Sequence, residues 1–382
     1  MDDTYFNREQ TAAKHFILRH YLQALALITL QGRFSTLTYV DGFSGPWQSR
    51  KPDFSDTSFM IAIKVLRDIQ WQLKDKGYNP TIKCFFAEKD PASFALLDPV
   101  VRKYNCPDQN FHVTTFEGRF VDAIPSIIMF TEGMTLTFID PTGWTEYPFD
   151  TVEPLLKRPN SETLVNFMYD HISRFTSWDN EANIQSFNSI LRPGWWDRID
   201  RNFSPGEAVE RLFKKEFKSA GAFKYVVSTP IKKVSDRTHF CITYGTRHSK
   251  GLEVYRDVEH KALRDHEFRR LDSQISKKVA SSGQQHMFKA DALDATANLE
   301  AERKAELEAA MTWVKQRLKS VTGGKQFVEL WPQMLEQFSL RLTDAKDACV
   351  ELERRGIIEP TWKKRGPRVK KPDDGDLIVL RV

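Results

Sequence analysis

Residues 36–46, Thr-Leu-Thr-Tyr-Val-Asp-Gly-Phe-Ser-Gly-Pro, decide the fold. A short run of β-branched and aromatic residues ends at Asp41, and a turn that contains Gly42, Phe43 and Gly45 follows it. Glycine lets a ligand approach the backbone closely, and the free N–H groups of such a turn suit a carboxylate. The stretch therefore predicts a strand whose carboxyl end forms one side of a ligand site. The alternative is an ordinary tight turn.

Further short strands follow, and helical patterns alternate with them. We expect strands at 81–87, 111–116, 135–139 and 163–168, and helices at 11–30, 56–74, 91–104 and 121–129. This alternation predicts an α/β fold with a parallel sheet and helices on both faces. Ligands of such sheets bind beyond the carboxyl ends of the strands. Asp41, Glu88, Glu117 and Asp140 fall on that edge.

Two more β-rich runs, 223–229 and 239–245, lie too close together for a helical crossover, so we expect an antiparallel pair. A helical insertion at about 172–220 precedes them. A parallel sheet closed by an antiparallel hairpin is typical of class I methyltransferase-like Rossmann domains and separates them from dehydrogenase domains. The sequence therefore predicts such a domain over residues 1–265.

Residues 266–298 are polar and predict a connector, although they would also suit a surface excursion of the first domain. Residues 299–382 then predict a winged-helix domain. Its helices are expected at 299–321, 330–337 and 343–355, and 357–359 would pair with 377–380. Thr343 suits the N-cap of the last helix, and Gly356 its end.

A cluster of basic residues marks the end of this second domain. It consists of Arg354, Arg355, Lys363, Lys364, Arg365, Arg368, Lys370 and Lys371, with Glu359 as the one opposing acid. A local excess of positive charge suggests a polyanionic partner, so these residues are our candidates for nucleic-acid binding. The alternative is a solvated surface or a disordered tail.

Acids at two strand ends are candidates for holding a nucleoside. Glu88 could accept hydrogen bonds from both hydroxyls of a ribose, as carboxylates do in dinucleotide sites. Glu117 could accept a hydrogen bond from an adenine amine, although nearby Asp122 could do the same. Each acid would equally suit a solvated loop.

The stretch Asp140-Pro141-Thr142-Gly143-Trp144 is the short motif that points most specifically to a function. An aspartate and the main-chain carbonyl that follows it, fixed by Pro141, can accept both N–H groups of an amine and so position the amine for attack. Trp144 could stack on a splayed base. The alternative is a proline-initiated turn with a core tryptophan.

Other site classes find little support in the sequence. The four cysteines lack zinc or redox spacing and indicate reduced thiols, the nine histidines lack metal-ligand spacing, and no phosphate-binding P-loop occurs. We therefore expect no metal. No stretch reaches the roughly 20 apolar residues of a membrane span, and residues 1–6 do not resemble a signal peptide. These features predict a cytoplasmic protein.

Several of these stretches together resemble the three-Cys-motif partner family (TcmP). The matching pieces are 14–22, 41–46, 57–59, 86–88, 140–144 and 244–252. The family is named after a genomic neighbour, a three-cysteine protein that is similar to radical S-adenosylmethionine enzymes. The resemblance implies that protein as a partner and S-adenosylmethionine as the cofactor. The stretch around Asp140 is also similar to that of tRNA guanine amine methyltransferases. Where the family's turn continues with glycine, this chain has Trp47.

Our leading expectation is an S-adenosylmethionine-dependent methyltransferase that acts on nucleic acid, DNA or RNA. The methionine would lie against Asp41 and the turn that follows it, the ribose against Glu88, and the acceptor amine against Asp140 and Pro141. The rival is a non-catalytic adaptor that brings the three-cysteine protein to nucleic acid. A nuclease is disfavoured, because the paired carboxylates and lysine of such sites are not evident.

Overall fold

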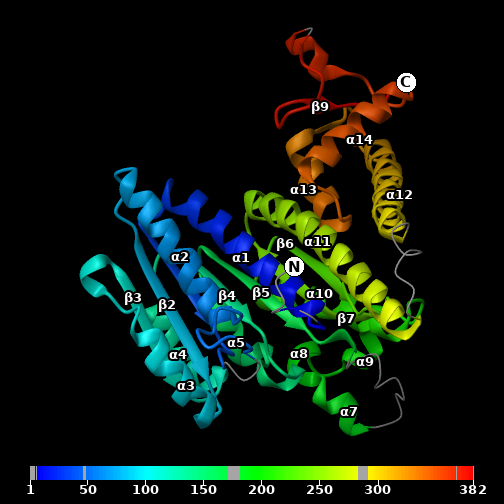
Figure 1. The fold of residues 1–382 in the computed structure, drawn as a ribbon. Coiled ribbons are helices and arrows are strands. Elements are labelled where there is room, and N and C mark those ends of the chain that lie inside the picture. Colours follow the sequence, from blue (N-terminus) through cyan, green and yellow to red (C-terminus); the bar gives the residue numbers. More distant parts are fainter. Residues whose placement is uncertain are drawn as a thin grey trace. The chain divides into compact units, whose positions relative to one another are not determined.

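The computed structural model describes residues 5, 7–45, 49–170, 181–282, 291–366 and 368–381. The chain divides into two compact units, Met1–His248 and Ser249–Val382. The first unit is an α/β domain, and the second is mainly helical (Figure 1). Within the described residues, no helix is long and apolar enough to cross a bilayer.

A seven-stranded sheet in the order β3-β2-β1-β4-β5-β7-β6 forms the centre of the first unit. Its strands are β1 (Thr36–Asp41), β2 (Thr81–Glu88), β3 (Phe111–Glu117), β4 (Met134–Ile139), β5 (Ser161–Phe167), β6 (Tyr225–Lys232) and β7 (Thr238–Thr246). The first five strands run parallel, and β7 is antiparallel to both β5 and β6. The expected parallel sheet closed by an antiparallel pair is confirmed. The strand order reverses between β1 and β4, which is where open α/β sheets bind ligands.

Helices α1 (Glu9–Leu30) and α2 (Ser58–Asp75) pack together over one face of the sheet. Polar side chains are buried beneath α1. The Tyr21 hydroxyl donates to Glu162 Oε2 and contacts the Tyr244 hydroxyl, and Thr246 Oγ1 donates to Glu162 Oε1 at 2.7 Å. These bonds satisfy a carboxylate that would otherwise be costly to bury.

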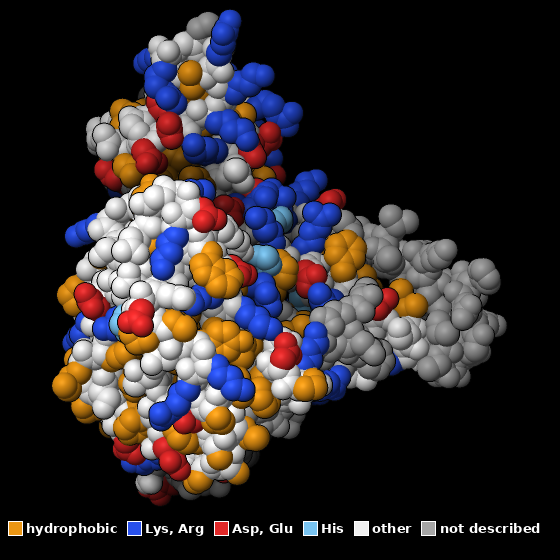
Figure 2. Space-filling model, turned by 60° about the vertical axis from the view of Figure 1, so that its left-hand side comes forward, with side chains coloured by type: hydrophobic (Ala, Val, Ile, Leu, Met, Phe, Trp, Pro, Cys, Tyr) orange, Lys and Arg blue, Asp and Glu red, His pale blue; other side chains and the backbone are white. Residues whose placement is uncertain are grey.

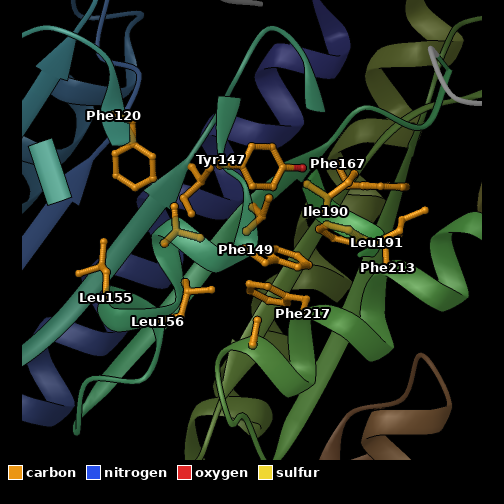
Figure 3. Packing of buried hydrophobic residues seen from close by; sticks show 14 of the residues in the cluster. Phe120, Tyr147, Phe149, Leu155, Leu156, Phe167, Ile190, Leu191, Phe213 and Phe217 are labelled. Atoms are coloured by element: carbon orange, nitrogen blue, oxygen red, sulfur yellow. The ribbon is translucent and has the colours of Figure 1, made fainter. Parts of the chain in front are cut away.

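The opposite face packs a large aromatic core against α4 (Phe120–Phe130), α5 (Phe149–Leu156) and α10 (Pro205–Ala220) (Figure 3). Phe167 of β5 stacks on Phe213 of α10 with ring centroids 4.3 Å apart. Residues from β5 reach both faces because successive side chains of a strand alternate. The short helix α5 was not expected from the sequence, because its eight residues include Pro154 and show too few turns for a clear period.

The remaining elements of this unit are short or lie at its edges. They are α3 (Pro91–Arg102), α7 (Glu181–Ser186), α8 (Asn188–Leu191), α9 (Trp195–Arg198) and the 3₁₀ turns at Pro107–Gln109 and Trp144–Glu146. Helices α7 to α10 occupy the described part of the expected insertion, 181–220; residues 171–180 lie outside the described residues.

The second unit begins with two long helices, followed by a small helical body and a two-stranded pair. Its elements are α11 (Ser249–Ser282), α12 (Asp291–Lys319), β8 (Lys325–Gln326), α13 (Phe327–Gln337), α14 (Leu342–Arg354), a 3₁₀ turn at Thr361–Arg365 and β9 (Leu377–Ile378). Strand β8 pairs with β9, and Ile358 bridges to Leu380. The expected pairing of 357–359 with 377–380 is therefore confirmed at the bridge between Ile358 and Leu380, whereas Leu377 and Ile378 pair with β8 instead.

The ends of α14 agree with the expectation at one side only. Gly356, with φ +72°, follows the helix, and Ile357 N donates back to Leu352 O at 2.9 Å. The expected N-cap, Thr343, is wrong: the N-cap residue is Arg341, whose backbone N–H donates to the Asp344 carboxylate at 2.9 Å. The carboxylate at the third helical position thus accepts from the N–H of the N-cap residue, which is the half of a capping box that the side chain at the third helical position supplies.

The polar region around residue 265 is helical in the structure. Helix α11 runs through position 265, and the two units divide after His248. The expected connector, 266–298, falls largely within α11 and α12, while 283–290 lie outside the described residues. The polar composition was a poor guide because a buried charge inside the expected connector is paired within the helix. Arg270 is 1% exposed and donates to the carboxylate of Glu267.

Candidate functional site

Two adjoining cavities of the first unit lie at the carboxyl edge of the sheet, where the strand order reverses. The first has a volume of about 280 Å³ and the second about 380 Å³. Phe43, Asp140 and Thr142 line both, so the cavities meet at the ends of β1 and β4. Together they have the size of an ordinary small-molecule site.

The turn after β1 is held from several sides. Ser44 N donates to Ala87 O at 2.9 Å, which fixes the turn to β2. Gly42 has no room for a side chain, because a Cβ there would lie 2.5 Å from Cδ2 of Phe120. Gly42 and Phe43 line the first cavity, and Gly45 lines the second, as expected for ligand-binding residues. Pro46 and Trp47 lie outside the described residues.

Asp41 differs from the expectation, because it is fully buried and lines neither cavity. Its carboxylate accepts a hydrogen bond from Phe43 N at 3.1 Å and another from Ser58 Oγ at 2.7 Å. Burial raises the pKa of Asp41 to about 6, and the nearby charge of Asp140 contributes, while the bonds from Ser58 and Phe43 oppose the increase. Asp41 therefore shapes the turn from behind.

Of the two acids expected to hold a nucleoside, Glu88 lines the first cavity and Glu117 does not. Glu88 is 6% exposed, and its Oε1 accepts a hydrogen bond from Asp90 N at 2.8 Å. Its Oε2 has no hydrogen bond to any described residue. Glu117 lies opposite Glu88 in the β2–β3 register, but its side chain is exposed to solvent. Adjacent strand ends do not guarantee that both side chains face the same space.

Asp140 lies where the two cavities meet and is already bound on both carboxylate oxygens. Lys14 of α1 donates to Oδ2 at 2.5 Å, and Asn166 of β5 donates to Oδ1 at 2.6 Å. Pro141 is buried and lines the second cavity. The two donors come from elements far away in the sequence, so the orientation of Asp140 depends on the whole sheet.

Trp144 does not line either cavity. Its ring stacks on Phe187, with centroids 4.8 Å apart and planes 13° apart, and its Nε1 donates to Ser186 Oγ at 3.2 Å. The alternative interpretation, a tryptophan that packs in the fold, describes its contacts. The turn after Pro141 directs the indole toward α8 and away from the site.

The second cavity contains functional groups that the sequence interpretation missed. They include Arg8, Lys14, His15, Asn166, His239 and Phe240. Two of the cations have acidic partners: Lys14 pairs with Asp140, and Arg8 pairs with Asp56 at 3.3 Å. Burial lowers the pKa of His15 well below its ordinary value, and the charges of Lys14 and Arg8 add to this effect. These pairs leave the cavity polar without a strong excess of either charge.

His239 brings a titratable ring to the same cavity. Its Nδ1 lies 3.8 Å from Asp170 Oδ2, and Asp170 also pairs with Lys233. Asn166 was the more detectable of the missed residues, because an amide inside the apolar run 164–167 needs a buried partner. Lys14 gave no comparable signal.

The basic cluster near the end of the second unit is largely paired with acids. Five of its cations have carboxylate partners: Arg354 with Glu351, Arg355 with Glu308 and Glu351, Lys363 with Glu353, Arg365 with Asp376, and Lys371 with Asp347. Lys364, Arg368 and Lys370 have no ion pair within the described residues. Figure 2 shows Lys and Arg side chains over the last elements of the chain, at the top of the view, with Asp and Glu among them.

A metal site is not evident in the part of the chain that the structure describes, where no three His, Cys, Asp or Glu side chains are grouped to hold an ion. Three carboxylates line the first cavity: those of Glu88, Asp140 and Glu146. Glu88 accepts a hydrogen bond from Asp90 N, and Asp140 accepts one from Asn166. The arrangement therefore suits the binding of an organic ligand through hydroxyl and amine groups.

Comparison with family models gives no match, and comparison with curated proteins gives none either. Among solved structures, protein LPL1258 from Legionella pneumophila has 11% identity and a TM-score of 0.33, and the match covers 61% of this chain and 85% of that one. Loganic acid methyltransferase with SAH has 9% identity and a TM-score of 0.27, with 79% of this chain and 92% of that one covered. Both likenesses are too distant to indicate a shared activity.

Proposed function

We propose that this protein is an S-adenosylmethionine-dependent methyltransferase that acts on an exocyclic amine of a nucleic-acid base. One observation carries the proposal: two cavities meet at Asp140, at the point where the order of a methyltransferase-type sheet reverses. A transferase needs a cofactor space and an acceptor space that share one wall. The strand order supports the fold class, and the wall that the two cavities share supports the location of the site.

The first cavity suits the adenosyl part of the cofactor. Oε2 of Glu88, which has no hydrogen bond to described residues, is placed to accept hydrogen bonds from ribose hydroxyls. Phe120 and Val121 supply apolar contacts for a base, and the turn at Gly42 to Gly45 leads toward the second cavity. When bound, S-adenosylmethionine supplies an electrophilic methyl group.

The second cavity would hold the acceptor. Each carboxylate oxygen of Asp140 retains lone-pair capacity beyond its bond to Lys14 or Asn166, so it can accept an N–H from an amine. Positioning of this kind lowers a barrier by fixing the direction of attack. Phe43 and Phe240, which line this cavity, are better placed than Trp144 to contact a base.

We further propose, from the resemblance of its motifs, that the chain is a three-Cys-motif partner protein, and its protein partner would then be the three-cysteine protein of that family. The second unit supports a nucleic-acid substrate. Its order of helix, short strand, two helices and paired strands resembles that of a winged helix, and we propose residues 359–376 as the wing. Basic side chains on such a module suit a phosphate backbone.

A non-catalytic adaptor is the second candidate, and one observation favours it. Both oxygens of Asp140 already accept hydrogen bonds, from Lys14 and Asn166, so an amine must add to an occupied carboxylate. In an adaptor this ion pair would simply close the edge of the sheet.

Two measurements separate the candidates. Calorimetry with S-adenosylmethionine should show binding to the wild-type chain, and no binding would reject the enzyme. Radiolabelled methyl transfer to pooled DNA and RNA, with and without the three-cysteine protein, should then depend on Asp140. Binding without transfer to any pool, in the wild type and in Asp140→Ala alike, would favour the adaptor.

A further inference from the structure

The end of the second unit presents two kinds of cation. In the C-terminal loop, which we define as residues 359–376, Lys364, Arg368 and Lys370 are exposed and have no ion pair within the described residues. Lys363 and Lys371 of the same loop pair instead with carboxylates of α14, Glu353 at 3.0 Å and Asp347 at 2.5 Å. The loop therefore carries some exposed cations that are paired with acids of α14 and others that have no acidic partner within the described residues.

Helix α14 carries the acids of these pairs. Asp347, Glu351 and Glu353 lie along it, and Glu351 pairs with Arg354 and Arg355 at the end of the same helix. A phosphate that approached α14 would have to replace these carboxylates and then lie beside them. Like charges at such distances repel, so the helix is a poor surface for a polyanion.

The loop is held in place on the rest of the second unit. Trp362 is fully buried, and the far side of the loop is tied to α13 by Trp331 Nε1, which donates to Asp374 Oδ1 at 2.9 Å. Arg365 donates to Asp376 Oδ2 at 2.6 Å across the loop. These contacts order the backbone that carries the cations without an acidic partner among the described residues, so less entropy is lost when a ligand binds.

We propose that Lys364, Arg368 and Lys370 bind the phosphodiester backbone of a nucleic-acid duplex, and that α14 does not enter a groove to read bases. The inference rests on the proposed action on nucleic acid and specifies its mode. Binding through phosphates alone carries no sequence information, so the second unit would hold a duplex of any sequence. The choice of target would then belong to the cavities of the first unit.

The test compares two triple variants of the full chain with equal loss of charge. The first variant is Lys364→Gln, Arg368→Gln, Lys370→Gln, and the control is Arg354→Gln, Lys363→Gln, Lys371→Gln. Fluorescence anisotropy measures binding to labelled DNA duplexes of three unrelated sequences, and to RNA duplexes of the same sequences, over a range of salt concentrations.

We expect the slope of log K against log salt to fall by about 2 to 3 in the first variant, since each lost phosphate contact removes roughly 0.9. The control should lose less than about half of that. A third variant, Lys363→Gln, Glu353→Gln, Lys371→Gln, Asp347→Asn, keeps the net charge and should bind as tightly as the wild type. The three sequences should bind within about threefold of one another, and the DNA and RNA series will show which duplex is preferred.

Equal slopes in the first variant and the control, or weaker binding by the charge-neutral variant, would overturn the inference while leaving the nucleic-acid substrate intact. A preference above about tenfold for one sequence would overturn it too. No binding of any duplex by the wild type would reject the inference, whereas methyl transfer to the pooled DNA and RNA tests the proposed substrate separately. All substituted side chains lie at the surface or are half-buried, so each variant should fold, and circular dichroism is the check.

Discussion

The ammonium nitrogen of Lys14 lies 2.5 Å from Oδ2 of Asp140, and both side chains are about 15% exposed. This ion pair joins the first helix of the chain to the carboxyl end of β4, and it is the link between α1 and the shared wall of the two cavities. The coupling free energy of this ion pair shows whether α1 contributes to the site or only covers the sheet.

We expect Lys14→Met to lower the free energy of unfolding by about 1 to 3 kcal/mol at pH 7, because it leaves the shielded carboxylate of Asp140 without its cation. The double variant with Asp140→Asn should lose less than the sum of the two single losses, by at least about 1 kcal/mol in urea denaturation. The exposed pair of Lys64 and Asp53 is the control and should show a clearly smaller coupling, because solvent and salt screen exposed ion pairs. Equal coupling in both pairs would contradict this role for Lys14.

Asp41 should make stability depend on pH in a defined direction. Its pKa is about 6 in the folded chain and near 3.8 when unfolded, so the folded state binds the proton more tightly. The free energy of unfolding therefore falls as pH rises from about 4 to 6, by about 2 to 3 kcal/mol, and levels off above that.

Asp41→Asn should remove this part of the pH dependence, because the amide keeps an acceptor for Phe43 N and cannot ionise. The measurement is urea denaturation of both chains between pH 4.5 and pH 7. Parallel curves for the wild type and the variant would show that Asp41 is ionised throughout.

The two strand-end acids offer a matched pair of substitutions. Glu88→Gln should weaken S-adenosylmethionine binding by about 10- to 100-fold in calorimetry, because a charged acceptor is lost from the first cavity. Glu117→Gln removes the same charge from the neighbouring strand end, outside the cavity, and should change the affinity less than about twofold. Similar losses in both would mean that only long-range charge matters.

Gly42→Ala should damage the first cavity through Phe120. The added Cβ would lie 2.5 Å from Cδ2 of Phe120, so the phenyl ring must move. Because Phe120 lines the first cavity, its movement changes the shape of the cavity. Overpacking of this kind costs about 1 to 3 kcal/mol, and we expect cofactor affinity to fall about tenfold or more. Gly143→Ala, where no atom lies within 4 Å of the added Cβ, is the control and should bind as the wild type does. An unchanged affinity in Gly42→Ala would mean that Phe120 does not shape the ligand space.

Much of the first unit was predictable because strands and their ends are local features. The β-rich run that ends at Asp41 and the run that ends at Glu88 lie where the pattern placed them, and so does the hairpin that closes the sheet. The direction of each side chain was not predictable to the same degree. Asp41 lies behind its turn, and Trp144 turns toward Phe187, because contacts with α2 and α8 decide these orientations.

The residues that were missed come from distant parts of the chain. Lys14 pairs with Asp140, 126 positions further along the chain. No local sequence pattern identifies a lysine on a half-buried helix as the ion-pair partner of a distant carboxylate. In the second unit, charge counts predicted a uniformly basic end. The structure divides those cations into a group paired with acids and a group without an acidic partner in the described part of the chain, which requires knowing that α14 lies beside the loop.

Some of the residues that the first helix contacts are synthesised long after the helix itself. Tyr21 of α1 contacts Tyr244, 223 positions further on, within the polar cluster around Glu162. At ribosomal rates of about 5 to 20 residues per second, α1 would wait roughly 10 to 45 seconds before β7 emerges. During that time α2 and β1, which are synthesised soon after α1, can cover part of its apolar side, while the side chains that contact β7, such as Tyr21, stay open to chaperones and to aggregation. The yield of folded protein in cells should therefore respond to whatever shields residues 9–30 while the rest is translated.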